Sequence, residues 1–159
     1  MVEVIVADLS KSAHAEALVF LLNAYALDAM GGGAALSDFV KENLVAELQK
    51  RSGAHVILAL LDNVPMGLAI CFEGFSTFAC QPLLNIHDVV VLSEYRGRGI
   101  AKKLLQKAEE IAVRNHCCKL TLEVLEGNVA AQSVYKACGY AGYELNPAAG
   151  KALFWQKKL

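Results

Sequence analysis

The chain has 159 residues, of which 55% are hydrophobic and 19% are charged, and its formal net charge is -1 at pH 7. A chain of this length can build one continuous hydrophobic core, so we expect a single domain spanning residues 1–159. The near-neutral charge disfavours nucleic acid as a partner, because binding a phosphate backbone normally needs a cationic face. Every apolar run is interrupted before the ~20 residues that a membrane span requires, and the N-terminus shows no secretion signal, which predicts a soluble, cytoplasmic protein without a membrane partner.

The N-terminal part of the chain is predicted to form one strand followed by a helix. Residues 2–7 are rich in β-branched side chains and indicate a strand. Asp8 and Ser10 supply cap chemistry for a helix over residues 11–29, whose apolar side chains recur at helical spacing. The glycines at residues 31–33 end this helix.

The middle of the chain predicts a second helix and three strands. Ser37 is a natural N-cap for a helix that ends near Gly53. Strands are expected at His55–Leu61 and Met66–Phe75, whose short connection suggests a hairpin. A further strand is expected at Leu83–Val91.

The C-terminal part begins with the most regular helix of the chain, which starts at Ile100 and separates apolar from charged side chains. A strand follows at residues 119–124, and the helix between it and the preceding strand predicts a parallel pair joined by a right-handed crossover. A short helix at residues 129–137 and two short strands, at 140–144 and 152–157, are expected to complete the fold.

Cysteine and histidine usage argues against disulfides and metal binding. The five cysteines form no Cys-x-x-Cys pair, and the four histidines are scattered singly. A zinc site requires paired ligands at a suitable spacing. We therefore predict reduced thiols and no metal site.

The segment from Val89 to Ala101 leads from an apolar strand, through a glycine-interrupted turn, into a helix. The first turn of a helix leaves N–H groups unpaired and carries partial positive charge, so an anion is stabilised there. Gly97 and Gly99 can adopt positive φ and let a phosphate approach the main chain. The cationic side chains around the same point are Arg96, Arg98, Lys102 and Lys103. Neither a Walker-type loop nor the dinucleotide fingerprint fits, since the latter needs a third glycine where Lys102 stands.

Two motifs in this part of the chain resemble one known family. Arg96-Gly97-Arg98-Gly99-Ile100-Ala101 resembles the [QR]-x-x-G-x-[GA] acetyl-CoA loop of the GNAT acetyltransferase superfamily, and residues 128–140 resemble its downstream N-x-x-[AS]-x-x-x-Y-x-x-x-G-[FY] element. The resemblance implies an α/β GNAT-like fold: a central mixed, mostly antiparallel sheet with a parallel, splayed strand pair, flanked by helices. Residues 86–91 and 95–97 are most similar to the polyamine-type acetyltransferases.

The resemblance also implies acetyl-CoA as co-substrate. Its pyrophosphate would lie on the main chain of residues 96–102, and its pantetheine arm along residues 89–91. The residues expected to contact the coenzyme are Val89, Val90, Val91, Arg96, Gly97, Arg98, Gly99, Ile100, Ala101, Lys102, Asn128 and Tyr135. Asn128 is equally suited to capping the short helix.

The implied reaction is direct attack of a neutral amine on the thioester, without a covalent acyl-enzyme. Tyr135 resembles the family tyrosine that protonates the leaving thiolate, and the alternative is a tyrosine packed on the core. The base is expected to be His87 or Asp88, which stand where relatives carry an acidic pair. Strand alternation would place these two side chains on opposite faces, so that only one looks into the cleft. A histidine of ordinary pKa can accept a proton at neutral pH, although a structural role for His87 is as plausible.

The acceptor site is expected across the splayed strands, next to the mobile loop at residues 30–35. Tyr25, Asp28 and Glu73 are candidates for drawing in an ammonium group, and each is also consistent with an ordinary surface residue. The predicted function is acetyl transfer from acetyl-CoA to a primary amine of a small molecule. The alternatives are a protein N-terminal or lysine acetyltransferase and a non-catalytic coenzyme-A-binding sensor.

The resemblance also suggests a homodimer, because relatives often pair through their C-terminal strands. The tail of this chain carries the apolar residues Leu153, Phe154 and Trp155. The same side chains are equally able to complete the core of a monomer.

Overall fold

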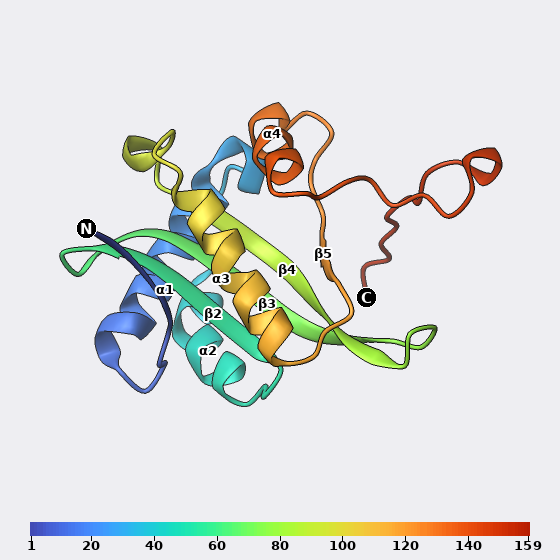
Figure 1. Ribbon diagram of the computed structural model, residues 1–159. Coiled ribbons are helices and arrows are strands. Elements are labelled where there is room, and N and C mark those ends of the chain that lie inside the picture. The colour runs from blue at the N-terminus through green and yellow to red at the C-terminus, as the bar shows by residue number, and fades with distance from the viewer.

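A five-stranded sheet with the order β1-β2-β3-β4-β5 forms the centre of the computed structural model, which describes residues 1–159 (Figure 1). The first four strands pair antiparallel, and β4 and β5 pair parallel. The strands are β1 (Val2–Val6), β2 (Ala54–Leu61), β3 (Val64–Ser76), β4 (Gln81–Val91) and β5 (Leu120–Leu122). The predicted mixed sheet, the hairpin and the parallel crossover are confirmed.

Helices cover both faces of this sheet. Helices α1 and α2 lie on one face and α3 on the other, while α4 stands beyond the end of β5 (Figure 1). The helices are α1 (Ser12–Leu27), α2 (Asp38–Gln49), α3 (Ile100–Arg114) and α4 (Val129–Ala137), and the short 3-10 turns are η1 (Ala29–Gly31), η2 (Ser93–Tyr95) and η3 (Pro147–Ala149). None of the helices combines the length and the apolar character that crossing a bilayer requires.

Helix α3 packs on the sheet because its apolar side chains recur at helical spacing and form one buried stripe. This stripe consists of Ile100, Leu104, Leu105, Ala108, Ile111 and Ala112. Gly67 of β3 allows a close approach, since a Cβ there would lie 3.2 Å from side-chain atoms of both Ile100 and Leu104. On the opposite face, Leu18 and Leu21 of α1 are fully buried in a second cluster. The sheet is therefore held between two hydrophobic layers.

The predicted cap of the first helix is wrong. Lys11 is the N-cap residue of α1, and it makes no side-chain cap hydrogen bond. The Asp8 carboxylate instead accepts hydrogen bonds from the backbone and the hydroxyl of Ser10, at 3.0 and 2.6 Å. The two residues thus form a local turn before the helix rather than its cap.

The two strands predicted at residues 140–144 and 152–157 are absent. A single bridge between Glu144 and Lys151 is the only β pairing in this segment, which extends away from the sheet (Figure 1). Pro147 opens a 3-10 turn and Gly150 follows it with φ 79°, so the chain is interrupted between the two expected strands. Neither half pairs with the short strand β5.

Candidate active site at the carboxyl end of β4

Strands β4 and β5 separate after a short parallel contact. They pair only from Leu84 to Ile86 of β4, against Leu120 to Leu122 of β5. Beyond that point residues 89–91 pair with β3 alone, so one edge of β4 offers main-chain groups without a sheet partner. Backbone N–H and C=O groups need partners when they are buried, and an extended ligand can supply them. The predicted splay is confirmed.

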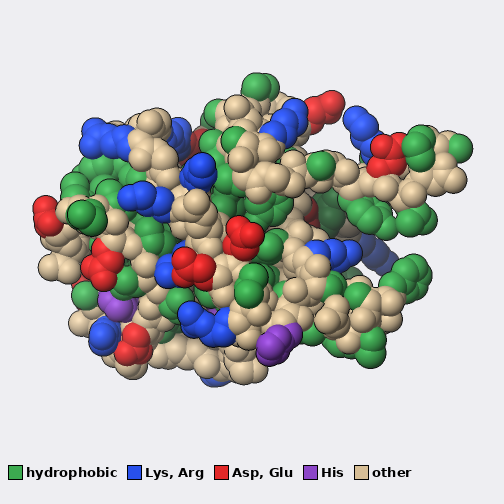
Figure 2. Space-filling view, in the orientation of Figure 1, with side chains coloured by type: hydrophobic (Ala, Val, Ile, Leu, Met, Phe, Trp, Pro, Cys, Tyr) green, Lys and Arg blue, Asp and Glu red, His purple; other side chains and the backbone are tan.

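The loop between β4 and α3 lies at the same end of the sheet. Gly97 and Gly99 both adopt left-handed φ, 75° and 74°, and a Cβ on either would meet no atom within 4 Å. Gly99 is the N-cap residue of α3, whose first turn carries no acidic side chain. The first N–H groups of a helix have no intrahelical partner and point outward. This loop therefore has the geometry of an anion site, and Figure 2 shows Lys and Arg side chains gathered around it.

The two arginines of the loop are engaged by the protein itself. Arg96 donates from Nε to the carbonyl of Val91 at 3.0 Å and from Nη2 to the carboxylate of Asp28 at 2.8 Å. Arg98 donates to the carbonyl of Glu94 at 3.1 Å and lies over the ring of Tyr95. The arginines thus stabilise the loop, and the space next to the Cα atoms of Gly97 and Gly99 is open.

A β-bulge lies where the candidate base residues stand. Ile70 of β3 pairs with Asp88 and the next residue, Cys71, pairs with Ile86, so His87 is an extra residue in β4. A bulge of this kind shifts the alternation of side chains along the strand. Ile86 accordingly packs in the core under α3, whereas Val90 packs in the core under α1 and α2.

The bulge places His87 and Asp88 on the same face, so the expectation that they point to opposite faces is wrong. The ring of His87 contacts Phe72 edge-on at a centroid distance of 5.5 Å, and Phe72 packs with the α1–α2 core. Asp88 stands two residues before Val90 in β4, so the two side chains point to the same face of the sheet. The charge of Asp88 raises the pKa of Tyr25 on α1. Burial raises the pKa of Asp88, and the nearby His87 opposes this shift.

Two tyrosines approach these residues from different helices. The pKa of Tyr25 is raised by burial and then by the carboxylates of Asp88 and Asp28. The pKa of Tyr135 on α4 is raised by burial and then by Tyr25, so the two phenols are close enough for their charges to interact. Helix α4 is fixed at its start by Asn128, whose side chain accepts a hydrogen bond from the backbone of Ala131 at 3.2 Å. The capping role foreseen for Asn128 is confirmed.

A family model described as the acetyltransferase (GNAT) family matches residues 21–140, more than half of the chain. The chain belongs to the GNAT acetyltransferase family. It is similar to the thialysine N-epsilon-acetyltransferase of Bos taurus, at 35% identity over 74 residues that cover 46% of this chain and 43% of that protein. Streptothricin acetyltransferase A of Bacillus subtilis is 36% identical over 117 residues, which cover 69% of this chain and 65% of that protein.

The chain thus spans less than half the length of the bovine relative that it matches. Among solved structures, a probable acetyltransferase superposes with a TM-score of 0.83 at 22% identity, covering 98% of both chains. This likeness is one of fold. It agrees with the mixed sheet and the splayed strand pair of the GNAT chain described above.

The residues predicted as acceptor ligands and as bases fall into two groups. The candidate bases His87 and Asp88 and the acceptor candidate Tyr25 lie on the face covered by α1 and α2, and the acceptor candidate Asp28 reaches the glycine loop before α3 through Arg96. Glu73 is elsewhere: its Oε1 accepts a hydrogen bond from Asn115 at 2.6 Å and lies 2.7 Å from His55 Nε2.

Glu73 also lies far along the sheet from the loop. Its partner in β4 is Leu84, seven residues before Val91. At ~3.3 Å per strand residue this is a separation of about 23 Å. The structure therefore does not bring Glu73 to the other candidates, and its hydrogen bonds anchor the end of α3.

Two features of the site were missed from the sequence. Phe72, the aromatic partner of His87, stands in an apolar strand with nothing to distinguish it. The ion pair between Asp28 and Arg96 joins residues 68 positions apart, and no local sequence pattern predicts such a contact.

Proposed function

We propose that this chain is an acetyl-CoA-dependent N-acetyltransferase that transfers the acetyl group to a primary amine of a small molecule by direct attack in a ternary complex. The observation that carries the proposal is the position of the splayed β4 edge between the glycine loop and the cluster of Tyr25, Asp88 and Tyr135. A coenzyme bound along this edge would present its thioester to that cluster.

The main chain of the loop would hold the coenzyme. The N–H groups of residues 96–102 suit its pyrophosphate, because they are the unpaired donors of a helix start next to two left-handed glycines. The free edge of residues 89–91 suits the amides of its pantetheine arm. Asn128 and Tyr135 at the start and in the body of α4 would lie beside the arm's thiol end.

Side chains from both faces of the sheet would supply the proton transfers: Asp88 and His87 from the α1–α2 face, and Tyr135 from beside the α3 core. A raised pKa makes the Asp88 carboxylate a stronger base than an exposed aspartate, so it can take a proton from the incoming ammonium, directly or through water. His87, on the same face, is the second candidate for this role. Tyr135 would return a proton to the departing thiolate, as a phenol whose neutral form is favoured by burial.

The acceptor is proposed to be a small molecule. Asp88 gives the acceptor side a carboxylate and Tyr25 gives it a hydroxyl, which suit an ammonium group, whereas the Asp28 carboxylate is paired with Arg96. The relatives named after thialysine and streptothricin support amine acceptors of this size. The competing functions, acetylation of a protein amine and coenzyme sensing without catalysis, use the same coenzyme loop.

One assay series separates these functions. Acetyl-CoA binding is measured by calorimetry, and thiol release is then followed colorimetrically against thialysine, polyamines, streptothricin and lysine-containing peptides, with enzyme lacking acceptor as the blank for the protein's own cysteines. We expect binding and turnover with at least one small amine. Turnover with peptides alone would support the protein acetyltransferase, binding without any turnover would support the sensor, and no uptake of acetyl-CoA would overturn the proposal.

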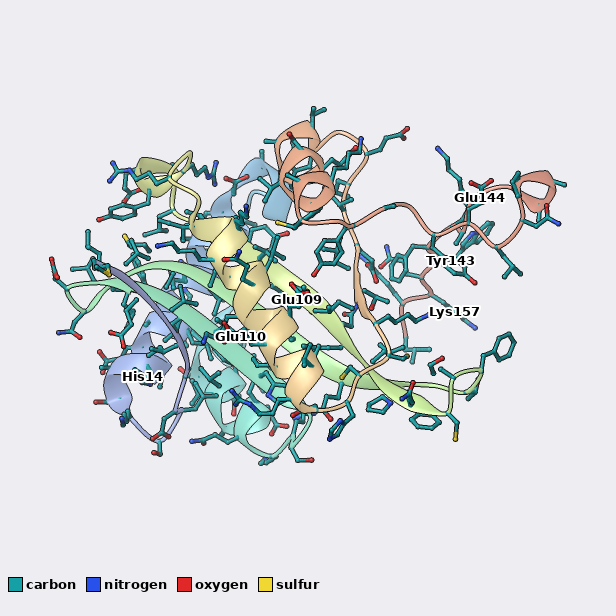
Figure 3. The ribbon with its side chains drawn as sticks, in the orientation of Figure 1. His14, Glu109, Glu110, Tyr143, Glu144 and Lys157 are labelled. Atoms are coloured by element: carbon teal, nitrogen blue, oxygen red, sulfur yellow. The ribbon has the colours of Figure 1, made fainter.

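We also propose that the protein acts as a homodimer formed through its C-terminal segment. Leu153, Phe154 and Trp155 are between 74% and 82% exposed, and Figure 2 shows hydrophobic side chains gathered on this segment. Tyr143, Glu144 and Lys157 lie on the same extension, away from the sheet (Figure 3). Light scattering should give twice the chain mass of 17.1 kDa for the wild type. Trp155→Ser should shift the protein toward the mass of a single chain. A wild-type monomer at all concentrations would contradict a dimer.

A further inference from the structure

Asp28 lies at the junction of three structural elements. It is the C-cap residue of α1 and the N-cap residue of the 3-10 turn η1, where its Oδ1 accepts a hydrogen bond from the backbone of Met30 at 2.9 Å. Its other oxygen, Oδ2, accepts from Arg96 Nη2 at 2.8 Å. One carboxylate thus binds the segment after α1 with one oxygen and the coenzyme loop with the other.

The segment from residue 28 to residue 33 is folded tightly on this anchor. The carbonyl of Asp28 accepts hydrogen bonds from Gly31 at 2.9 Å and Gly33 at 3.1 Å. A Cβ on Gly31 would lie 1.8 Å from the carbonyl oxygen of Tyr25, so only glycine permits this contact. The position of segment 28–33 against Tyr25 therefore depends on the turn that starts at Asp28, to which the carboxylate contributes the hydrogen bond from Met30.

Arg96 completes the connection to the coenzyme loop. Its Nε donates to the carbonyl of Val91, the last residue of β4, at 3.0 Å, and its Nη2 donates to Asp28. Its guanidinium is thereby neutralised by a carboxylate before any anion arrives, and the nearby Arg98 binds the carbonyl of Glu94. The cations of the loop free of ion pairs are Arg98, Lys102 and Lys103.

We propose that Asp28 is a positioning residue of the transfer reaction: its ion pair with Arg96 joins the acceptor-side segment 28–33 to the coenzyme loop, so that coenzyme and amine strengthen each other's binding. This inference rests on the proposed function. Arg96 is then a connector between the two sites rather than a ligand of the pyrophosphate. Binding of the coenzyme to the main chain at residues 96–102 fixes Arg96, Arg96 fixes Asp28, and Asp28 fixes the segment beside Tyr25.

The pair has little to contribute to global stability. The side chain of Arg96 is 54% exposed and that of Asp28 is 27% exposed, and exposed ion pairs contribute typically ~0–1 kcal/mol. If the ion pair had only a structural role, its loss would therefore change the free energy of unfolding little and amine affinity hardly at all. If it positions segment 28–33, its loss lowers amine affinity. Coupling between two binding sites is reciprocal, so the coenzyme must then gain from the amine what the amine gains from the coenzyme.

Asp28→Asn is the decisive variant, because asparagine keeps an oxygen for the backbone of Met30 and remains a good N-cap residue. It is compared with Arg96→Gln, with the double variant, and with Glu47→Gln as control. Glu47 is bonded to Lys50 and Arg51 on the exposed side of α2 and takes no part in the site.

The first measurement is hydrogen exchange of segment 28–36 with and without coenzyme A, which requires no acceptor. We expect coenzyme A to slow exchange there in the wild type and in Glu47→Gln, and to leave it unchanged in Asp28→Asn. Unchanged exchange in a wild type that binds coenzyme A would overturn the inference while acetyl transfer stands. Failure of the wild type to bind coenzyme A would overturn both.

The second measurement is steady-state kinetics with the best amine of the panel. We expect Asp28→Asn to raise the amine KM by about 5-fold or more, the lower end of usual coupling factors, with kcat within about 3-fold of the wild type. Arg96→Gln should do the same, and the double variant should be no worse than either single change. Additive effects, or a fall in kcat at unchanged KM, would contradict the connector role.

Discussion

Replacement of Gly99 by alanine tests whether the main chain of the coenzyme loop holds a pyrophosphate. Gly99 has φ 74° and ψ 9°, the left-handed region in which a Cβ costs about 1–2 kcal/mol. The added Cβ would meet no atom within 4 Å, so no steric cost is added. Alanine also lowers the entropy of the unfolded chain, which returns about 0.4–1 kcal/mol. The net loss is on the order of 1 kcal/mol, a fall in Tm of about 2–4 °C for a chain of this size.

The effect of Gly99→Ala on the coenzyme should exceed its effect on stability. The substituted alanine would relieve its backbone strain by a change in φ and ψ, which turns the neighbouring main-chain N–H groups away from the pyrophosphate. The loss of one hydrogen bond to a charged group costs about 1.5–3 kcal/mol. The Kd for coenzyme A, measured by calorimetry, should therefore rise roughly 10- to 150-fold. Gly150→Ala is the control, because Gly150 also has a positive φ, 79°, and equally open surroundings, and it lies outside both the loop and segment 28–33. It should lose stability in urea unfolding yet bind coenzyme A nearly as well, and an unchanged Kd for Gly99→Ala would refute the proposed binding of the pyrophosphate by the main chain.

Three further substitutions test the site and its support. Tyr135→Phe should lower kcat about 100-fold or more, much more than it weakens coenzyme A binding, since general acid catalysis contributes ~100- to 10,000-fold, and an unchanged kcat would remove Tyr135 from the mechanism. Leu104→Ala should reduce the free energy of unfolding by about 2–5 kcal/mol in urea, because Leu104 is fully buried, and a smaller loss would mean that the core collapses around the gap. Burial raises the pKa of Asp88, so the folded state holds its proton to higher pH than the unfolded state and stability falls as pH rises through that range. Asp88→Asn should abolish this dependence, and its urea midpoint should gain on the wild type from pH 4 upward; parallel pH curves would contradict a buried, titrating Asp88.

The parts of the fold that the sequence predicts well are those encoded within a short segment. Helix α4 was predicted at residues 129–137 and begins and ends at these residues, because Asn128 caps it and Gly139, with φ 88°, follows it. The glycine-containing turn between β4 and α3 was predicted for the same reason, since strand, glycines and amphipathic helix are contiguous. Both Gly97 and Gly99 adopt the positive φ that the predicted anion-binding turn requires.

The parts that were not predicted depend on contacts between distant segments. The fate of residues 140–157 depends on whether β5 offers an edge long enough to pair with, and β5 pairs over three residues only. The position of Glu73 depends on His55 and Asn115, which come from other elements. Apolar alternation and turn signals carry no information on such partners.

The bulge at His87 illustrates how the packing of two hydrophobic cores can set the position of Asp88, the proposed base. Ile86 is needed in the core under α3 and Val90 in the core under α1 and α2, yet residues four apart on a regular strand share one face. Ile86 and Val90 can point to opposite faces only if β4 contains an odd number of extra residues between them. The pairing with β3 leaves one such residue, His87, without a partner. The bulge therefore follows from the two hydrophobic layers, and the turn of Asp88 toward Tyr25 is its consequence. A strand without the bulge would leave Asp88 on the α3 face, away from Tyr25, so the separation of the two cores is what places the proposed base on the same face as Tyr25 of the proposed acceptor side.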